Sequence, residues 1–279
     1  EACSDLVVDP SNNIVMVGRA TGGGWLSGGW QLAHSGGNDG FVIKVSPSGS
    51  VLWSSLFGGS DQELSYGAST DSSGNIYVAG ETSSTDWIGN SWMTEFNGGG
   101  WDGFVLKASA DGEYIFHSLI GGSDNDRAGD VVVAPDDGAY ICGYTYSHSW
   151  ICGGWDITYN GSQDGFVVKL FSDGRHSWSS YVGGINSDYC DKIAFYDDST
   201  IYVEGTTSSP NWLSGGHDTS YGFYGDSFVV QFGESNGQAS INLSPPEAVA
   251  AGAQWRRRYS DTWLDSGVTE TDVPAGIWQ

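Results

Sequence analysis

A repeat of about 62 residues constrains this sequence more than any other feature. An Asp-x-Phe-Val motif recurs at spacings of 63, 62 and 62 residues, beginning at Asp39, Asp102, Asp164 and Asp226. A glycine that closes a short apolar run recurs at nearly the same spacing, at Gly18, Gly80, Gly143 and Gly205. Fixed self-similarity of this kind marks a repeat architecture, in which one supersecondary unit is used several times. The chain therefore contains four copies of one unit.

The second copy shows the content of one unit most clearly. Four segments rich in β-branched and aromatic residues read as strands, at residues 66–70, 75–80, 103–107 and 114–120. Asp-Ser-Ser-Gly and Ala-Asp-Gly sequences separate them as turns, and a Gly/Ser/Trp-rich excursion covers residues 81–101. Four antiparallel strands per unit, repeated radially, are the β-propeller solution to exposed sheet edges. The sequence therefore predicts an all-β propeller rather than a row of independent sandwiches.

Three motifs carry a resemblance to a known family. They are Asp-Ser-Ser-Gly-Asn-Ile-Tyr-Val-Ala-Gly at 71–80, Asp-Gly-Phe-Val-x-Lys at 39–44, 102–107 and 164–169, and Gly-Gly-Ser-Asp at 58–61 and 121–124. Over roughly residues 2–238 the chain resembles the bacterial β-propeller repeats called SBBP repeats. The resemblance implies a propeller in a secreted or cell-surface protein and no defined catalytic activity. The fourth copy departs from the pattern, with Ser227 in place of Gly and Gln231 in place of Lys.

The repeat divides the chain into two regions. We predict a propeller over residues 1–238, with units at about 2–63, 64–126, 127–188 and 189–238. Residues 239–279 resemble a partial β-sandwich-like surface module, and both ends of the sequence read as cut from a longer protein. Four units either close as a four-bladed ring or form an arc of a larger one. We predict the closed ring, because an open arc would expose two apolar faces.

Charge excludes several classes of partner. The 279 residues hold 10 Lys+Arg against 34 Asp+Glu, a net charge of −24. A surface this acidic repels phosphate backbones and anionic lipid, so we predict no nucleic-acid partner. No apolar run approaches the roughly 18 residues of a membrane-spanning helix, so we predict no membrane span either.

Aromatic residues recur inside the excursions and are the candidate contact surface. One repeat position, the first tryptophan set, holds Trp25, Trp87, Trp150 and Trp212. Five residues later a second tryptophan set holds Trp30, Trp92, Trp155 and, as a departure, His217. Flat aromatic faces bind sugars or anchor protein interfaces. They also fill gaps between repeated sheets, and their regular recurrence favours that packing role.

The four cysteines suggest two disulfides and an oxidising compartment. Cys142 and Cys152 fall in one unit, on a strand and its following loop. Cys3 and Cys190 occupy the same repeat position in the first and fourth units, which are adjacent only in a closed four-bladed ring. Free thiols are the alternative. No Cys-x-x-Cys or His/Cys spacing indicates a zinc site.

Acidic side chains lie mostly in turns and predict no catalytic residue and no metal site. The four repeated Asp residues of the Asp-x-Phe-Val motif are expected to accept hydrogen bonds from backbone amides at a strand entry. We predict no cofactor; calcium stays open as an alternative, although no EF-hand-like loop is present. Acids that break the repeat are the ones an enzyme would use, namely Glu81, Glu95 and Glu204.

Three functions follow as hypotheses. The first is a non-catalytic extracellular or cell-surface β-propeller with a structural or adhesive role, which binds protein or polysaccharide and forms homo-oligomers or surface fibres. The second is a carbohydrate-binding, lectin-like propeller with the first tryptophan set as stacking platforms. The third is a polysaccharide-active hydrolase or lyase that uses Glu204 with another repeat-breaking acid.

Overall fold

The described part of the chain consists of strands and loops. The computed structural model describes residues 1–197, 200–210, 212 and 225–235, together with short strands at 238–240, 254–255 and 264–265. No helix occurs among these described residues. Four sheets have four antiparallel strands each, and a fifth is a two-stranded hairpin. The all-β prediction, with four four-stranded units, is confirmed.

Each sheet is a simple meander in chain order. The first sheet contains β1 (Ala2–Val8), β2 (Ile14–Ala20), β3 (Asp39–Val45) and β4 (Val51–Phe57). The second contains β5 (Glu63–Thr70), β6 (Ile76–Thr82), β7 (Asp102–Ala108) and β8 (Tyr114–Ile120). The third contains β9 (Asp126–Val133), β10 (Ala139–Thr145), β11 (Asp164–Leu170) and β12 (His176–Val182). The fourth contains β13 (Asp188–Asp197), β14 (Thr200–Thr207), β15 (Asp226–Ser235) and β16 (Gln238–Ser240).

The turns between the first two strands of a sheet follow the residue types expected of them. Asp71 accepts hydrogen bonds from the backbone nitrogens of Ser73 (3.0 Å) and Asn75 (2.8 Å). Asp9 does the same for Ser11 (2.9 Å) and Asn13 (2.8 Å) in the first sheet. A side chain that mimics a backbone acceptor in this way closes the turn and fixes the hairpin register.

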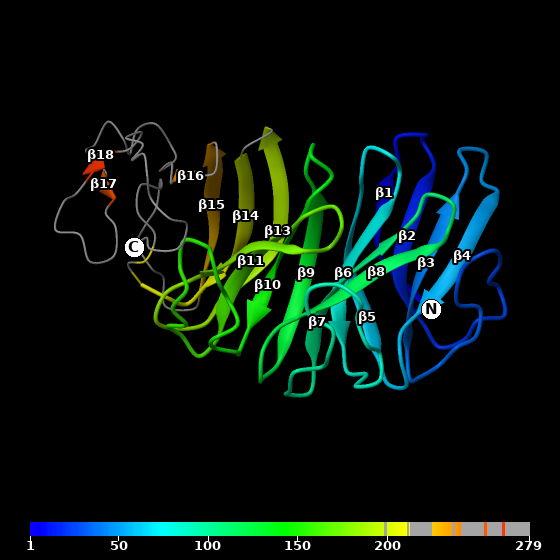
Figure 1. Cartoon of the computed structure of the whole chain (residues 1–279), viewed down its shortest axis with the longest axis horizontal. Coiled ribbons are helices and arrows are strands. Elements are labelled where there is room, and N and C mark those ends of the chain that lie inside the picture. The colour runs from blue at the N-terminus through cyan, green and yellow to red at the C-terminus, as the bar shows by residue number, and fades with distance from the viewer. Residues whose placement is uncertain are drawn as a thin grey trace.

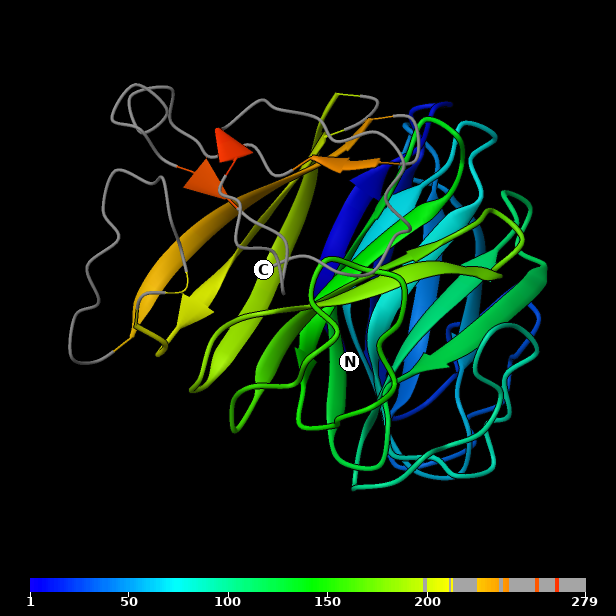
Figure 2. The same ribbon diagram turned by 60° about the vertical axis from the view of Figure 1, so that its left-hand side comes forward.

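The four sheets follow one another in a row (Figure 1). β1 packs beside β5, β5 beside β9 and β9 beside β13. The first and fourth sheets lie at opposite ends of the long axis of the molecule (Figure 1), and Figure 2 shows the same succession from another side. A closed four-bladed ring would bring β1 beside β13, and the described residues do not show that closure. The repeat count alone does not fix ring size, because the angle between neighbouring sheets depends on the side chains between them.

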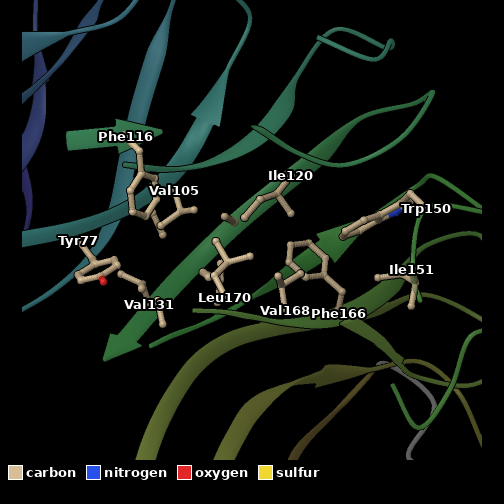
Figure 3. Packing of buried hydrophobic residues seen from close by; sticks show 14 of the residues in the cluster. Tyr77, Val105, Phe116, Ile120, Val131, Trp150, Ile151, Phe166, Val168 and Leu170 are labelled. Atoms are coloured by element: carbon tan, nitrogen blue, oxygen red, sulfur yellow. The ribbon is translucent and has the colours of Figure 1, made fainter. Parts of the chain in front are cut away.

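Apolar side chains fill the interfaces between neighbouring sheets. Figure 3 shows the interface of the second and third sheets, where Tyr77, Val105, Phe166 and Val168 lie in one buried cluster. Trp150, from the excursion after β10, packs at one side of the same cluster. Because both faces of each inner sheet are covered in this way, the two middle strands of the second and third sheets are buried along nearly their whole length.

Buried lysines add polar contacts between sheets. Lys44 pairs with Asp9 of its own sheet (2.8 Å) and donates a hydrogen bond to the backbone oxygen of Ala110 in the second sheet (2.9 Å). Lys107 repeats the arrangement one sheet further on, with Asp71 (3.2 Å) and the oxygen of Ser172 (3.1 Å). In the first two sheets, the Lys of the repeated Asp-Gly-Phe-Val-x-Lys motif therefore joins neighbouring sheets, which explains its place in the motif.

The long excursions cover the outer edge of the first three sheets. The backbone nitrogen of Leu56 in β4 donates to the oxygen of Gln31 (2.8 Å), and that of Leu119 in β8 donates to the oxygen of Met93 (3.0 Å). The nitrogen of Tyr181 in β12 donates to the oxygen of Asp156 in the same way (2.8 Å). The excursions thus pair with the outermost strand and remove an exposed edge that would otherwise attract other chains.

The C-terminal region contains one described hairpin, β17 (Gln254–Trp255) with β18 (Leu264–Asp265). β16 pairs with β15 and straddles residue 238, the boundary proposed from the sequence. Most of 239–279 lies outside the described residues, so the partial β-sandwich-like module stays a prediction.

Candidate functional site

The first tryptophan set packs against the repeated phenylalanine of the Asp-x-Phe-Val motif. The rings meet edge to face, with centroids 5.1–5.5 Å apart, in the pairs Trp25–Phe41, Trp87–Phe104, Trp150–Phe166 and Trp212–Phe228. Trp150 and Trp212 also donate their indole N–H to Thr145 and Thr207 of the neighbouring strand. Trp25, at 37% exposed, is the most accessible of the four. These contacts describe packing, and ligand binding by this set stays a prediction.

The second tryptophan set bridges neighbouring sheets. Trp30 lies beside Tyr114 of the second sheet (6.4 Å between ring centroids), and Trp92 stacks on His176 of the third (4.0 Å). Trp155 stacks on Phe232 of the fourth sheet (4.4 Å). His217 lies outside the described residues. Because neighbouring rings already cover part of these indole faces, a ligand here would have to use the remaining edges.

The cysteines are free thiols, so the two predicted disulfides are not formed. Cys142 is buried on β10, whereas Cys152 is exposed in the excursion that runs along β12. Cys3 is exposed on β1 of the first sheet, while Cys190 is buried at the interface of the third and fourth sheets. The second pair required closure of the ring, which the structure does not show. Cys142 and Cys190 instead share one buried cluster.

A buried acid at the start of the innermost strand recurs in three sheets and was missed in the sequence. It is Glu63, Asp126 or Asp188, and each accepts a hydrogen bond from a threonine of the next strand. Each also accepts the backbone N–H of the second glycine of a Gly-Gly pair, at Gly59, Gly122 and Gly184. Burial raises the pKa of Glu63 to about 7 and that of Asp126 to about 6. This hydrogen bond to the buried acid explains why the Gly-Gly pair recurs in the repeat.

The repeated Asp at the start of the third strand has the role expected of it. Asp39 accepts hydrogen bonds from the backbone nitrogens of Ser35 and Gly36, Asp102 from that of Asn97, and Asp164 from those of Asn160 and Gly161. Burial raises the pKa of Asp102 and that of Asp164 to about 7 each. The prediction of amide capping at a strand entry is confirmed for these three sheets.

The strongest candidate site is a group of side chains that we call the tyrosine–arginine patch. It comprises Tyr66, Glu81, Arg127, Tyr144, Tyr146 and Tyr189, contributed by the second, third and fourth sheets. The guanidinium carbon of Arg127 lies 3.7 Å from the ring centroid of Tyr66 and 5.7 Å from that of Tyr144. The Tyr66 hydroxyl donates to Glu81 at 2.6 Å. Tyr144 lies edge-on to Tyr189 (5.4 Å) and to Tyr146 (6.2 Å).

A β-bulge positions the central tyrosine of this patch. The pairing of β5 with β6 shifts register between Ser65 and Gly67, which leaves Tyr66 as the extra residue. The equivalent shift occurs in the innermost strand of the other three four-stranded sheets, at Ser4, Gly129 and Asp191. A bulge interrupts the alternation of side chains and turns one of them out of the ladder. The repeat therefore presents four such positions, and in the second sheet a tyrosine occupies it.

Burial shapes the electrostatics of the patch. Tyr66, Glu81, Arg127 and Tyr144 are all half-buried, and Tyr146 is 41% exposed. Burial raises the pKa of the Glu81 carboxyl, against the hydrogen bond from Tyr66 and the charge of Arg127, which lower it. Burial and the Glu81 carboxylate also raise the pKa of the Tyr66 hydroxyl. Arg127 forms no ion pair among the described residues, and its Nε is buried without a hydrogen-bond partner.

The patch breaks the repeat, and this is the signal that could have revealed it. The equivalents of Tyr66 are Ser4, Gly129 and Asp191, and the equivalents of Arg127 are Ala2, Leu64 and Tyr189. The sequence singled out Glu81 as unmatched but not its neighbours in space. Tyr66 and Arg127 lie 61 positions apart (127 − 66) and meet only because β5 packs beside β9.

The other repeat-breaking acids lie elsewhere. Glu95 is exposed in the excursion of the second unit, and Glu204 is half-buried in the middle of β14, paired in register with Val229. Within the described ranges, no group of three or more His, Cys, Asp or Glu side chains is arranged to hold a metal ion. The described part of the chain also contains no helix long and apolar enough to cross a membrane.

Comparisons with known proteins found distant similarities in sequence and in structure. The regulatory protein FlaEY of Caulobacter vibrioides is 25% identical over 177 residues, which are 61% of this chain and 18% of that protein. A protein of unknown function from Bacteroides caccae is similar in structure (TM-score 0.40, 11% identity, 85% of this chain and 58% of that one). The Pan2 WD40 domain of Neurospora crassa gives a TM-score of 0.43 at 14% identity, over 87% of this chain and 65% of that one.

The family comparison locates the repeat within the described sheets. Residues 52–86, which run from β4 through β6, match the model of the SBBP beta-propeller repeat. This segment contains the Gly-Gly pair, the buried acid Glu63 and the Asp-Ser-Ser-Gly turn described above. Over these residues the chain is therefore similar to the SBBP beta-propeller repeat.

Proposed function

We propose that the protein is a non-catalytic extracellular or cell-surface recognition module, a propeller-type scaffold that binds its partner at the tyrosine–arginine patch. One observation carries the proposal: the side chains that pack between sheets repeat, whereas those of the patch do not. A packing role would recur in every sheet, as the tryptophan–phenylalanine pairs do. A site for one partner has no reason to recur, and aromatic and Arg side chains are those enriched at recognition surfaces.

The family and the composition support the location. Repeats of this type imply secreted or surface proteins, and the net charge of −24 keeps such a protein soluble and away from anionic lipid. Adhesion or attachment to a surface polymer is the role that a rigid scaffold with one side-chain patch would serve. The chain spans 18% of the length of FlaEY, so the activity of any longer protein lies beyond this proposal.

Ring closure and fibre assembly remain separate proposals. Leu6, on the outward face of β1, is 60% exposed, whereas Val131 at the same repeat position of β9 is 3% exposed. These values favour an arc over the closed four-bladed ring, because closure would cover Leu6. The strands that would join one protomer to the next in a fibre fall in 239–279, most of which lies outside the described residues.

An adhesion assay tests the recognition role. Beads that carry the purified chain are applied to surfaces coated with polysaccharides or with proteins, and beads with the Arg127→Ala, Tyr144→Ala double variant are applied in parallel. We expect retention by at least one coating and its loss in the double variant. Equal retention of both bead types would exclude the patch as the contact surface.

The same coatings distinguish binding from catalysis. Release of reducing ends or of unsaturated sugars is measured over hours in the presence of the chain and of the Glu204→Gln variant. We expect no release above the buffer rate. Sugar release that depends on Glu204 would show that the protein is a polysaccharide-active enzyme and would overturn the proposed recognition function.

A further inference from the structure

Glu81 and Arg127 both contact Tyr66, and each keeps hydrogen-bonding capacity that no described residue uses. Glu81 receives its one described hydrogen bond from the Tyr66 hydroxyl, through Oε1, so its second oxygen keeps its acceptor capacity. Arg127 lies over the face of the same ring and has no carboxylate within ion-pair distance among the described residues. The Glu81 carboxylate and the Arg127 guanidinium therefore lie on the same tyrosine without forming an ion pair with each other.

We propose that the tyrosine–arginine patch binds a neutral sugar, with two neighbouring hydroxyls placed between Glu81 and Arg127 and the sugar ring against the exposed tyrosines. The inference rests on the proposed recognition function and names its ligand class. A hydroxyl both donates and accepts, so one hydroxyl of a vicinal diol donates to the carboxylate while the other accepts from the guanidinium. Charged partners make these hydrogen bonds the strong ones.

The aromatic side chains supply the apolar half of such a site. Tyr144, Tyr146 and Tyr189 form a continuous edge-to-face group, and each of them is at least partly exposed. The C–H face of a sugar ring is apolar, and an aromatic face of matching size removes it from water. Tyrosine hydroxyls at the rim add further donors and acceptors, so the patch matches a polyhydroxylated ring better than it matches a purely apolar ligand.

Charge argues for a neutral ligand over an ionic one. An anionic polymer would approach a molecule with a net charge of −24, so long-range repulsion opposes its binding. A quaternary ammonium ligand would meet the positive charge of Arg127, whose guanidinium carbon lies 3.7 Å from the ring centroid of Tyr66 and 5.7 Å from that of Tyr144. A neutral diol meets neither obstacle.

The buried Nε of Arg127 is consistent with a missing acceptor. Buried donors in folded proteins almost always have a partner, and one without a partner indicates a water or a ligand that belongs there. Because this nitrogen is buried, a sugar hydroxyl would reach it only after the groups around it shift.

Calorimetric titration of the purified chain tests the inference. The probes are neutral oligosaccharides of glucose, mannose, galactose and xylose, and oligogalacturonate and choline serve as charged comparisons. We expect saturable binding of at least one neutral series. Arg127→Gln should weaken it by about tenfold or more, as expected for a lost charged hydrogen bond. Arg127→Lys, which keeps the charge without the planar fork, should give an intermediate affinity.

Arg175→Gln is the matched control. Arg175 is an exposed arginine paired with Asp173 in the turn between β11 and β12, away from the patch, so its loss should leave the affinity unchanged. A second arm alters the ligand and leaves the protein intact: methylation of the sugar hydroxyls should abolish binding. This arm holds even where a variant folds poorly, and melting curves of each variant identify that case.

The outcomes separate the ligand class from the recognition role. Preference for oligogalacturonate or choline overturns the neutral-sugar inference and leaves the patch as a recognition site. Sugar binding that survives Arg127→Gln but fails in Trp25→Ala moves the lectin site to the first tryptophan set and overturns this inference. Adhesion to protein coatings through the patch, with no sugar bound, also overturns the neutral-sugar inference but keeps the patch as a recognition site. Failure of both adhesion and titration removes the recognition function itself.

Discussion

One valine position behaves differently in the first three sheets and in the fourth. Val42, Val105 and Val167 follow the phenylalanine of the repeated motif and are fully buried, because each faces the next sheet in the row. Val229 has the same place in β15 and is 64% exposed. Its register partner in β14 is Glu204, whereas the partner of Val167 in β10 is Cys142. The repeat thus determines that a strand forms, and the presence of a neighbouring sheet determines which side chains on that face of the strand must be apolar.

A carboxylate at this position gives the largest expected effect. Val167→Asp places an unpaired charge between the third and fourth sheets and should cost about 4–5 kcal/mol or more in the free energy of unfolding. Val229→Asp, its counterpart on the open face, should cost only about 1 kcal/mol or less, chiefly through repulsion from Glu204 on the opposite strand. Thermal and denaturant unfolding of both variants measures the difference. Equal losses would mean that the outer face of the fourth sheet is covered in solution.

The inter-sheet lysine gives a smaller effect of the same kind. Lys107→Ala leaves the buried Asp71 without its cation and the oxygen of Ser172 without its donor, and should cost about 3 kcal/mol. Gln231→Ala alters the equivalent position of the fourth sheet, where no motif lysine is present, and should stay within about 0.5 kcal/mol. The same unfolding measurements apply. A loss at Gln231 as large as that at Lys107 would contradict the assignment of this position to sheet-to-sheet contact.

The buried acids predict an effect of a different kind, a shift of stability with pH. The folded pKa values of Glu63, Asp102 and Asp164 are raised to about 7, and that of Asp126 to about 6. In the unfolded chain these groups ionise near pH 4, so between about pH 4 and pH 7 the folded state holds more protons. Stability should therefore fall as pH rises through this window and level off above it.

Melting temperatures at pH 5 and pH 8 check this sign, and Glu63→Gln should reduce the slope because one titrating group is removed. A control substitution is Asp173→Asn, an exposed acid whose pKa is lowered by its bonds to Arg175. That change should leave the slope between pH 5 and pH 8 as it is. A melting temperature that rises with pH would show that the buried acids are ionised in the folded protein.

Different parts of the molecule were predictable to different extents. The turns at Asp9 and Asp71 and the amide-capping role of Asp39 follow from local chemistry, and the structure bears them out. The disulfides were wrong, because pairing Cys3 with Cys190 assumed a ring closure that depends on the angles between sheets. The tyrosine–arginine patch was missed for a related reason: its residues are unremarkable one by one and converge only through the packing of three sheets.

The sequence by itself determined the unit: its four strands, its turns, its Gly-Gly closure and its repetition, since these depend on residues within about 62 positions of one another. The tertiary structure alone decided which units became neighbours on both faces, how far the row of sheets curved, and which side chains met across β5, β9 and β13. Contacts that recur in every unit are encoded by residues that recur in every unit, so the amino-acid sequence alone reveals them. A patch built from residues that do not repeat depends on distances that only packing sets.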